Sequence, residues 1–297
     1  MIFQKKLNII IVIIIIFFKS NIFADIIYLK NGGKIETELC FKQGKEIKFY
    51  RFNGIVSIPE NIVERIEKQA ISNKKDLIKN SQNHILNHPK VKNLLENNKK
   101  KYYKVNYVFD GDTIVLSNKK HVRYLGINTL EIDHSNKSKT NSNSFEILAY
   151  KYNKKMVYKN MIFLLFDENK IDQYKRTLAY VFLKKDNCCV NAKLLESGYA
   201  YCLYKFPNFL LYDYFTNIQK QAMINKLGIW KVLSKKYVKL TANHNSKRFH
   251  KPECKFARSI SDKNKGFFNN YWDAFFEGYA PCKSCFDTNK LFKSKFD

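Results

Sequence analysis

The sequence predicts an α+β protein built around a five-stranded β-barrel with three helices, between a small N-terminal β-unit and a small C-terminal module. Short strand-like runs separated by turn residues predict the barrel within residues 102–231. Apolar residues at helical spacing over residues 145–156 predict the first of its helices. A histidine and three cysteines after residue 249 set the C-terminal module apart.

The composition excludes two broad classes of protein. The chain has 297 residues, of which 45% are hydrophobic and 15% aromatic, with only 10 Gly and 5 Pro. It is therefore too apolar for a disordered polycation and too poor in Gly and Pro for a low-complexity protein. The net charge of +27 indicates a polyanionic partner, either nucleic acid or an anionic membrane surface. The basic residues are nearly all Lys, as an AT-rich genome would give, so charge alone identifies neither.

The first 24 residues are typical of a secretory signal peptide. Lys5 and Lys6 precede an apolar run over residues 7–18, and a small residue, Ala24, follows at the expected cleavage position. We therefore expect an exported protein, secreted or periplasmic, whose mature charge is +24 after the loss of three lysines. Ile22 is larger than the usual residue three positions before such a site. An uncleaved segment that anchors the protein to a membrane is the alternative.

Two regions separate this segment from the predicted barrel. Residues 25–68 contain short apolar runs with turn signals at Asn31-Gly32-Gly33 and Asn53-Gly54, which predict a small β-rich domain. Residues 69–101 are rich in Lys, Asn and Gln and predict a solvated, partly helical linker.

The pattern of strand-like and helical runs in residues 102–231 is typical of a small Greek-key barrel of the oligonucleotide-binding (OB-fold) type. Five strand-like runs are expected at 103–109, 113–116, 121–127, 161–166 and 178–183. Three helices are expected at 145–156, 190–197 and 209–226, the last ending at Leu227-Gly228.

Three motifs within this barrel together carry the groups that phosphodiester hydrolysis requires. They are Asp110-Gly111-Asp112-Thr113, the run from Arg123 to Glu131, and Asp172-Gln173-Tyr174-Lys175-Arg176. Oxygen ligands can hold a hard cation, and a carboxylate can accept a proton from an attacking water. Guanidinium groups bind phosphate with two parallel hydrogen bonds, which Lys cannot do.

These motifs, in this order and spacing, resemble the staphylococcal nuclease (thermonuclease) family over about residues 102–230. The ending Leu227-Gly228-Ile229-Trp230 fits the same pattern. The resemblance implies an endonuclease that uses calcium to cut DNA and RNA, with nucleic acid as substrate and no stable protein partner. Membrane association is implied only if the first segment is retained.

The resemblance also implies a role for each matching residue. For calcium, Asp112 is the main carboxylate, Asn128 occupies the place of a second acidic ligand, and Thr129 offers its backbone carbonyl. For catalysis, Glu131 is the general base or orients the water, while Arg123 and Arg176 bind the scissile phosphate.

Two tyrosines match substrate-binding positions of the family. Tyr174 matches a tyrosine that contacts phosphate, and Tyr204 resembles a tyrosine that stacks on the base.

The chain departs from the family pattern at two positions. Asn128 replaces a carboxylate by an amide, which keeps an oxygen but removes a negative charge and should weaken calcium binding. Asp110 and Asp133 lie close in sequence and could supply the missing charge. Leu130 replaces a proline before Glu131. The alternative to an active enzyme is therefore a catalytically inactive nucleic-acid-binding protein with the same barrel.

The C-terminal module, residues 243–288, has the spacing of a metal site. His250 and Cys254 form one half-site, and Cys282 and Cys285 form the C-x-x-C half. Three thiolates and one imidazole complete a tetrahedral structural zinc site. The pattern resembles zinc-binding modules related to the metal domain of the Ada DNA-repair proteins. Disulfides or a redox-active C-x-x-C are the alternative in an oxidising compartment.

Overall fold

The structure is a computed structural model of the chain and describes residues 25–37, 40–51, 54–67, 91–92, 96, 100–132 and 142–292. It divides into two compact units, residues 1–78 and 79–297. The predicted signal segment and most of the predicted linker lie outside the described residues. Within the described part, no helix is long and apolar enough to cross a membrane.

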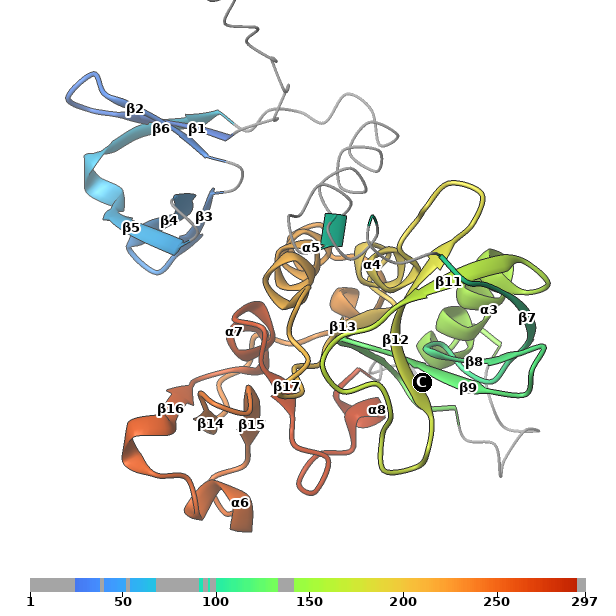
Figure 1. Cartoon of the computed structure of the whole chain (residues 1–297). Helices are drawn as coiled ribbons and strands as arrows, with labels where there is room; N and C mark the ends of the chain where they lie inside the picture. Colours follow the sequence, from blue (N-terminus) through green and yellow to red (C-terminus); the bar gives the residue numbers. More distant parts are fainter. Residues whose placement is uncertain are drawn as a thin grey trace, which may run out of the picture. The chain divides into compact units, whose positions relative to one another are not determined.

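The first unit is built from six short strands (Figure 1). Its two antiparallel sheets have the strand orders β2-β1-β6 and β3-β4-β5. The strands are β1 (Asp25–Leu29), β2 (Lys34–Thr37), β3 (Cys40–Gln43), β4 (Glu46–Arg51), β5 (Gly54–Pro59) and β6 (Val63–Glu67). Ile27, Cys40, Ile47 and Phe49 are buried together and form its small core.

The second unit contains a closed ring of five strands in the order β11-β12-β9-β8-β7. The strands are β7 (Tyr102–Val108), β8 (Thr113–Leu116), β9 (His121–Tyr124), β11 (Met161–Leu165) and β12 (Thr177–Leu183). All neighbours are antiparallel except β9 and β12, which run parallel. The expected helices are present as α3 (Phe145–Val157), α4 (Val190–Glu196) and α5 (Tyr212–Ile224). The prediction of a five-stranded ring with three helices is confirmed.

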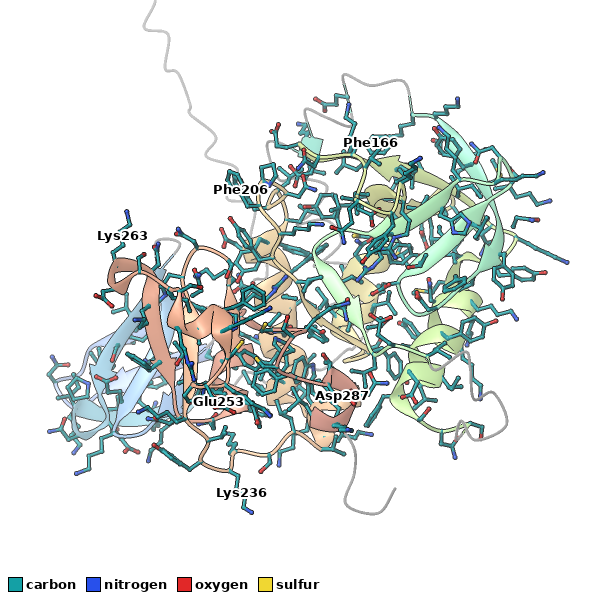
Figure 2. The ribbon with its side chains drawn as sticks, turned by 90° about the horizontal axis from the view of Figure 1, so that it is seen from below. Phe166, Phe206, Lys236, Glu253, Lys263 and Asp287 are labelled. Carbon is teal, nitrogen blue, oxygen red and sulfur yellow. The ribbon has the colours of Figure 1, made fainter. Side chains whose placement is uncertain are left out.

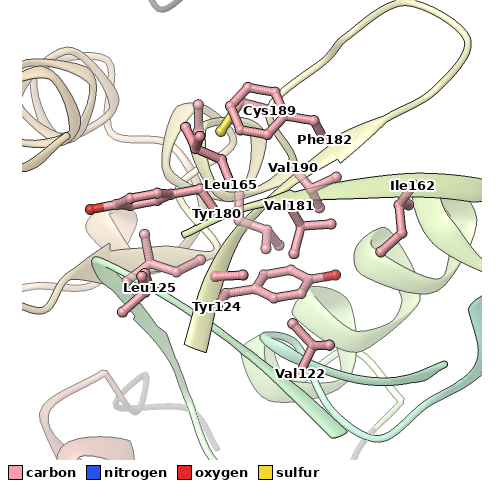
Figure 3. Close-up of a cluster of buried hydrophobic side chains, with 14 of the residues drawn as sticks. Val122, Tyr124, Leu125, Ile162, Leu165, Tyr180, Val181, Phe182, Cys189 and Val190 are labelled. Atoms are coloured by element: carbon pink, nitrogen blue, oxygen red, sulfur yellow. The ribbon is translucent and has the colours of Figure 1, made fainter. Parts of the chain in front are cut away.

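The core of this ring explains the orientation of β9. Figure 3 shows Val122 and Tyr124 pointing toward Val181 of β12 and Ile162 of β11, and all four are buried. Successive side chains of a strand point to opposite faces, so Arg123 lies on the face away from this core. Val91, within the predicted linker, is also fully buried in the core.

The expected strand over residues 121–127 is divided in the structure. β9 ends at Tyr124, and a new strand, β10 (Ile127–Thr129), pairs with β13 (Ala200–Cys202). Gly126 makes the break because its φ is +76°, and a Cβ there would overlap the Phe215 ring. The break turns the chain so that Asn128 and Thr129 leave the ring and pair with a segment about 70 residues later.

The C-terminal region folds as a four-stranded sheet, β16-β14-β15-β17, with short helices around it. Its elements are β14 (Leu240–Asn243), β15 (Arg248–His250), α6 (Lys255–Arg258), η3 (Asp262–Asn264), β16 (Lys265–Phe268), α7 (Tyr271–Phe276), β17 (Ala280–Pro281) and α8 (Thr288–Leu291). A 3-10 helix, η2 (Gly228–Lys231), lies between α5 and this sheet along the chain. Figure 1 shows α7 beside α5, and the two helices are in contact.

Candidate active site

The hairpin between β7 and β8 carries a buried carboxylate, Asp112. Its Oδ2 accepts a hydrogen bond of 2.9 Å from the backbone N–H of Thr129, and its Oδ1 accepts one of 3.2 Å from the Thr113 hydroxyl. The neighbouring Asp110 accepts the backbone N–H of Asp112 at 2.9 Å. The hairpin is thereby joined to the end of β10, and two carboxylates lie close together.

Arg123 connects three parts of this site. Its Nη2 lies 2.9 Å from Asp112 Oδ2 and donates to Asn128 Oδ1 at 2.6 Å. Its Nη1 donates to the backbone carbonyls of Tyr124 and Ile127 at 2.8 and 3.1 Å. The side chain is only 11% exposed, so the guanidinium is held in one orientation beside the carboxylate.

The electrostatics of Asp112 follow from its burial. Burial raises the pKa of Asp112 to about 6; the nearby Arg123 charge lowers it, and Asp110 raises it. A buried carboxylate beside another acid is a place where a bound cation would relieve repulsion.

Asn128 uses its amide hydrogens inside the site. Its Nδ2 donates to the Thr129 carbonyl at 2.7 Å and to the Tyr201 hydroxyl at 2.9 Å, while its Oδ1 faces Arg123. Asp112, Asn128 and Thr129, which the sequence assigns to calcium, are therefore brought together. The Thr129 carbonyl already accepts a hydrogen bond from Asn128, which a carboxylate at this position could not supply.

Arg176 is fixed by its own motif, directly before β12. Its Nε and Nη2 both lie 2.8 Å from Asp172 Oδ2, and Asp172 Oδ1 accepts the backbone N–H groups of Tyr174 and Arg176 at 2.9 Å each. Burial alone would raise the pKa of Asp172, but these hydrogen bonds from Arg176 and Tyr174 lower it below its usual value. Leu178 pairs with Arg123 across β9 and β12, so alternation places Arg176 on the face that carries Arg123.

The two predicted substrate tyrosines lie in different surroundings. Tyr174 is 70% exposed, and the Arg176 guanidinium carbon lies 5.3 Å from its ring centroid. Tyr204 is half-buried and packs edge-on against Tyr212 of α5, with ring centroids 5.1 Å apart. Tyr174 is thus close to a predicted phosphate ligand, whereas the ring contact of Tyr204 is with a helix.

Glu131 follows β10 and meets the C-terminal region. Its Oε1 lies 3.3 Å from Lys283 Nζ, and both side chains are exposed. Its backbone N–H donates to Asn289 Oδ1 at 3.2 Å, and its backbone carbonyl accepts from Asn289 Nδ2 at 2.8 Å. In Figure 2, Asp287 marks the start of α8, the helix that carries Asn289.

Several residues of the site were missed by the sequence reasoning. Tyr201 supports Asn128, and Asn153 of α3 joins the Tyr124 hydroxyl to the Asp110 carbonyl. Lys283 and Asn289 reach Glu131 from more than 150 positions away. Asn153 falls at helical spacing between the apolar Ala149 and Val157, which signals a buried position; no local pattern signals the other three.

The four predicted metal ligands of the C-terminal region converge. The ligand atoms of His250, Cys254, Cys282 and Cys285 all lie within 4.8 Å of one another, and the first three residues are buried. The three thiols are not in disulfides. Burial lowers the pKa of His250, which keeps its imidazole neutral at pH 7. No other group of three or more His, Cys, Asp or Glu side chains in the described part of the chain converges in this way.

Fold and site together define a small barrel protein in which carboxylates and an amide surround Arg123, and a further carboxylate holds Arg176. Residues 121–232 match the family model described as staphylococcal nuclease homologue. The thermonuclease of Staphylococcus hyicus is 32% identical over 139 residues, 46% of this chain and 79% of that protein. The thermonuclease of Staphylococcus intermedius is 32% identical over 131 residues, 43% of this chain and 75% of that protein.

An uncharacterised protein of Methanocaldococcus jannaschii is 33% identical over 149 residues, 43% of this chain and 71% of that protein. The chain belongs to the staphylococcal nuclease family. The matched segment contains Arg123, Asn128, Glu131 and Arg176 and ends before the C-terminal sheet begins.

Proposed function

We propose that the protein is an exported, calcium-dependent endonuclease that hydrolyses phosphodiester bonds of DNA and RNA. The observation that carries the proposal is the pair of fixed guanidinium groups, Arg123 and Arg176, on one face of the β9–β12 ladder. Glu131 supplies a carboxylate two residues after the end of β10, the strand that contains Asn128 and Thr129. The relation to two thermonucleases supports the same chemistry.

The chain's own residues divide the reaction between them. Arg176 donates to a non-bridging phosphate oxygen from Nη1, because its Nε and Nη2 already contact Asp172. Arg123 donates from Nε, because both of its Nη groups already contact acceptors within the protein. Both guanidinium charges neutralise the charge that develops on the phosphate. The exposed Glu131 carboxylate accepts a proton from the attacking water. Because Asp112 and Asp172 hold the two arginines before substrate arrives, little reorganisation is needed during the reaction.

The donor set at the hairpin suits calcium. Asp112, Asn128 and Thr129 would hold the ion, all through oxygen, and Asp110 adds a second negative charge nearby. Burial, which raises the pKa of Asp112, and the neighbouring Asp110 both disfavour the ionised carboxylate, and a bound cation would offset both effects. Calcium supplies positive charge that polarises the phosphate and helps to bind the water.

A second candidate function, nucleic-acid binding without catalysis, is favoured by one observation. Asn128 donates to the carbonyl of Thr129 and accepts from Arg123, so both of its polar atoms are used within the protein. We expect Asn128→Asp to strengthen calcium binding by about tenfold, through the added ligand charge. Calcium titration by calorimetry measures this, and an unchanged affinity would place the ion away from residue 128.

We also propose that His250, Cys254, Cys282 and Cys285 bind a structural zinc ion, consistent with the resemblance to Ada-type metal modules. Sulfur ligands 2.3 Å from a tetrahedral zinc lie about 3.8 Å from one another, close to the spacing of this cluster. A disulfide would use only two of the three thiols and would leave the histidine without a role.

Arg248 gives independent support for a charged metal centre. Its Nη1 is buried without a hydrogen-bond partner among the described residues, and the groups whose charge acts on it are Tyr201, Cys282 and Tyr212. A buried guanidinium is costly unless an opposite charge lies near it. Zinc bound by three thiolates and a neutral imidazole carries one net negative charge, which would compensate Arg248.

Export is proposed from the first 24 residues. If cleavage follows Ala24, the N-terminus of the protein recovered outside the cytoplasm should begin at Asp25. An intact N-terminus in the membrane fraction would instead indicate the anchored form.

The nuclease proposal is tested with residues 25–297, single-stranded DNA and RNA, and calcium or a chelator. We expect calcium-dependent cleavage that Glu131→Gln lowers by about 100-fold or more, because the variant keeps the shape of the side chain but not its basicity. Glu253→Gln, an exposed change in the C-terminal module, is the matched control. Wild-type cleavage no faster than that of Glu131→Gln would contradict the enzyme and favour the binding protein.

A further inference from the structure

The C-terminal module touches the segment that carries the proposed general base. One side chain, Asn289 of α8, pairs with both backbone polar groups of Glu131, as acceptor at 3.2 Å and donor at 2.8 Å. We propose that the C-terminal module forms half of the active site, in which Asn289 is a positioning residue that fixes the backbone of Glu131. The proposal rests on the nuclease function proposed above.

The module is joined to the barrel by a buried aromatic cluster. Trp230, at the end of the family-matched segment, packs edge-on against Phe275 and Phe292 of the module, at 5.3 and 5.7 Å between centroids. Tyr201 of β13 packs against the same two phenylalanines at 5.5 and 6.4 Å. All four side chains are at most 2% exposed. Burial of this kind fixes the relative position of the two parts.

Hydrogen bonds from α5 fix the same arrangement. The Tyr212 hydroxyl donates to the Gly278 carbonyl at 3.0 Å, and the buried Gln219 donates to the Phe275 carbonyl. Gly278 has a φ of +79°, and a Cβ there would overlap the Tyr212 hydroxyl. The chain thus has a glycine where the module comes closest to the helix.

Tyr201 links the module to the metal-side residues as well. Its hydroxyl accepts from Asn128 Nδ2 at 2.9 Å and is hydrogen-bonded to Thr288, the first residue of α8. Asn289 follows directly and reaches Glu131. One turn of helix therefore contacts Glu131 directly and is linked to Asn128 through Tyr201.

The proposed zinc site includes a turn that also reaches Glu131. Lys283, between the two cysteines of the C-x-x-C half, extends to the Glu131 carboxylate at 3.3 Å. Because both side chains are exposed, this ion pair adds little stability. It shows instead that the turn from Cys282 to Cys285 and the proposed base Glu131 are neighbours. We therefore expect that a loss of structure in this turn makes the position of Glu131 less well defined.

The test compares Asn289→Ala with Asn245→Ala, an exposed turn residue of the same module, in the chain 25–297. We expect Asn289→Ala to lower kcat about tenfold with KM within about twofold, since small misplacements of a catalytic group reduce rate strongly. We also expect faster hydrogen exchange at the Glu131 amide, with an unchanged thermal midpoint. Asn245→Ala should alter none of these.

The two proposals fail in different ways. Wild-type protein without Glu131-dependent cleavage would contradict the nuclease function, while the exchange rate at Glu131 in Asn289→Ala still decides whether the contact holds the loop. Unchanged exchange at Glu131 would overturn the positioning role, whatever the activity. Faster exchange together with unchanged kcat would overturn it as a requirement for catalysis.

Discussion

The two sides of the proposed active site are supported in different ways. Arg176 is held by Asp172, four residues away, so a single loop before β12 fixes it. Glu131 is held by Asn289, 158 residues away, so its position depends on a second folded region. The difference teaches that the proposed phosphate ligand is held within the barrel alone, whereas the proposed general base is held by the C-terminal module.

The largest effect is expected from removing Arg176, the guanidinium group that is held within the barrel. Arg176→Ala should lower kcat by about 100- to 1000-fold, because it removes charge stabilisation from the transition state. Steady-state kinetics on a short single-stranded DNA measures this, with the exposed Arg258→Ala as the control of equal charge. If Arg258→Ala reduced the rate equally, general attraction of nucleic acid, not a placed guanidinium, would explain the result.

Removing a ligand of the proposed zinc site should lower kcat by a smaller factor, through the contacts of the C-terminal module with Glu131. Cys282→Ser should abolish zinc binding, lower the thermal midpoint and reduce kcat by about tenfold, because α8 follows this turn directly. Elemental analysis should find one zinc per wild-type chain and none in the variant. Ser284→Ala, within the same turn, should retain zinc and activity. A zinc-free wild-type protein with Cys282 and Cys285 oxidised would contradict the metal site.

The smallest effect concerns Asp112, which contacts Arg123 and the backbone N–H of Thr129. Its folded pKa is about 6 and its ordinary value is 3.8, so the folded protein takes up a proton between these pH values that the unfolded chain releases. The contribution of this group to stability is therefore present below pH 4 and is lost as pH rises to about 6.

In metal-free protein, the unfolding free energy of wild type relative to Asp112→Asn should fall by about 1–3 kcal/mol over that interval. Urea unfolding at pH 4, 5, 6 and 7 measures the difference. A difference that stays constant, or that grows with pH, would show that the folded pKa of Asp112 is not raised above its unfolded value.

The barrel side was largely predictable from the sequence, because its determinants are local. Each of these determinants lies within a few residues of sequence. They are the turn at Asp110–Thr113, the alternation that directs Arg123 away from the barrel core, and the contact of Asp172 with Arg176. The ligand spacing from His250 to Cys285 is similarly readable, since a tetrahedral metal site requires particular residue types in close pairs.

The surroundings of Glu131 could not be predicted from the sequence, because its contacts join segments that lie far apart in the chain. The sequence predicts one strand over residues 121–127, whereas in the structure the chain turns at Gly126 and Asn128 pairs with Tyr201. The contacts of Asn289 and Lys283 with Glu131 depend on how the module packs against α5 and Trp230. Packing of this kind is set by side-chain shape across the whole fold and has no local signature.

The most direct test of the two-sided site is the hydrogen exchange of two backbone amides in one sample, with zinc bound and after its removal. The Arg176 N–H donates to Asp172 within the barrel, and the Glu131 N–H donates to Asn289 of the module. We predict that zinc removal speeds exchange at Glu131 by about tenfold or more and leaves Arg176 unchanged. Equal protection at Glu131 with and without zinc, or equal loss at both amides, would contradict a site held separately by barrel and module.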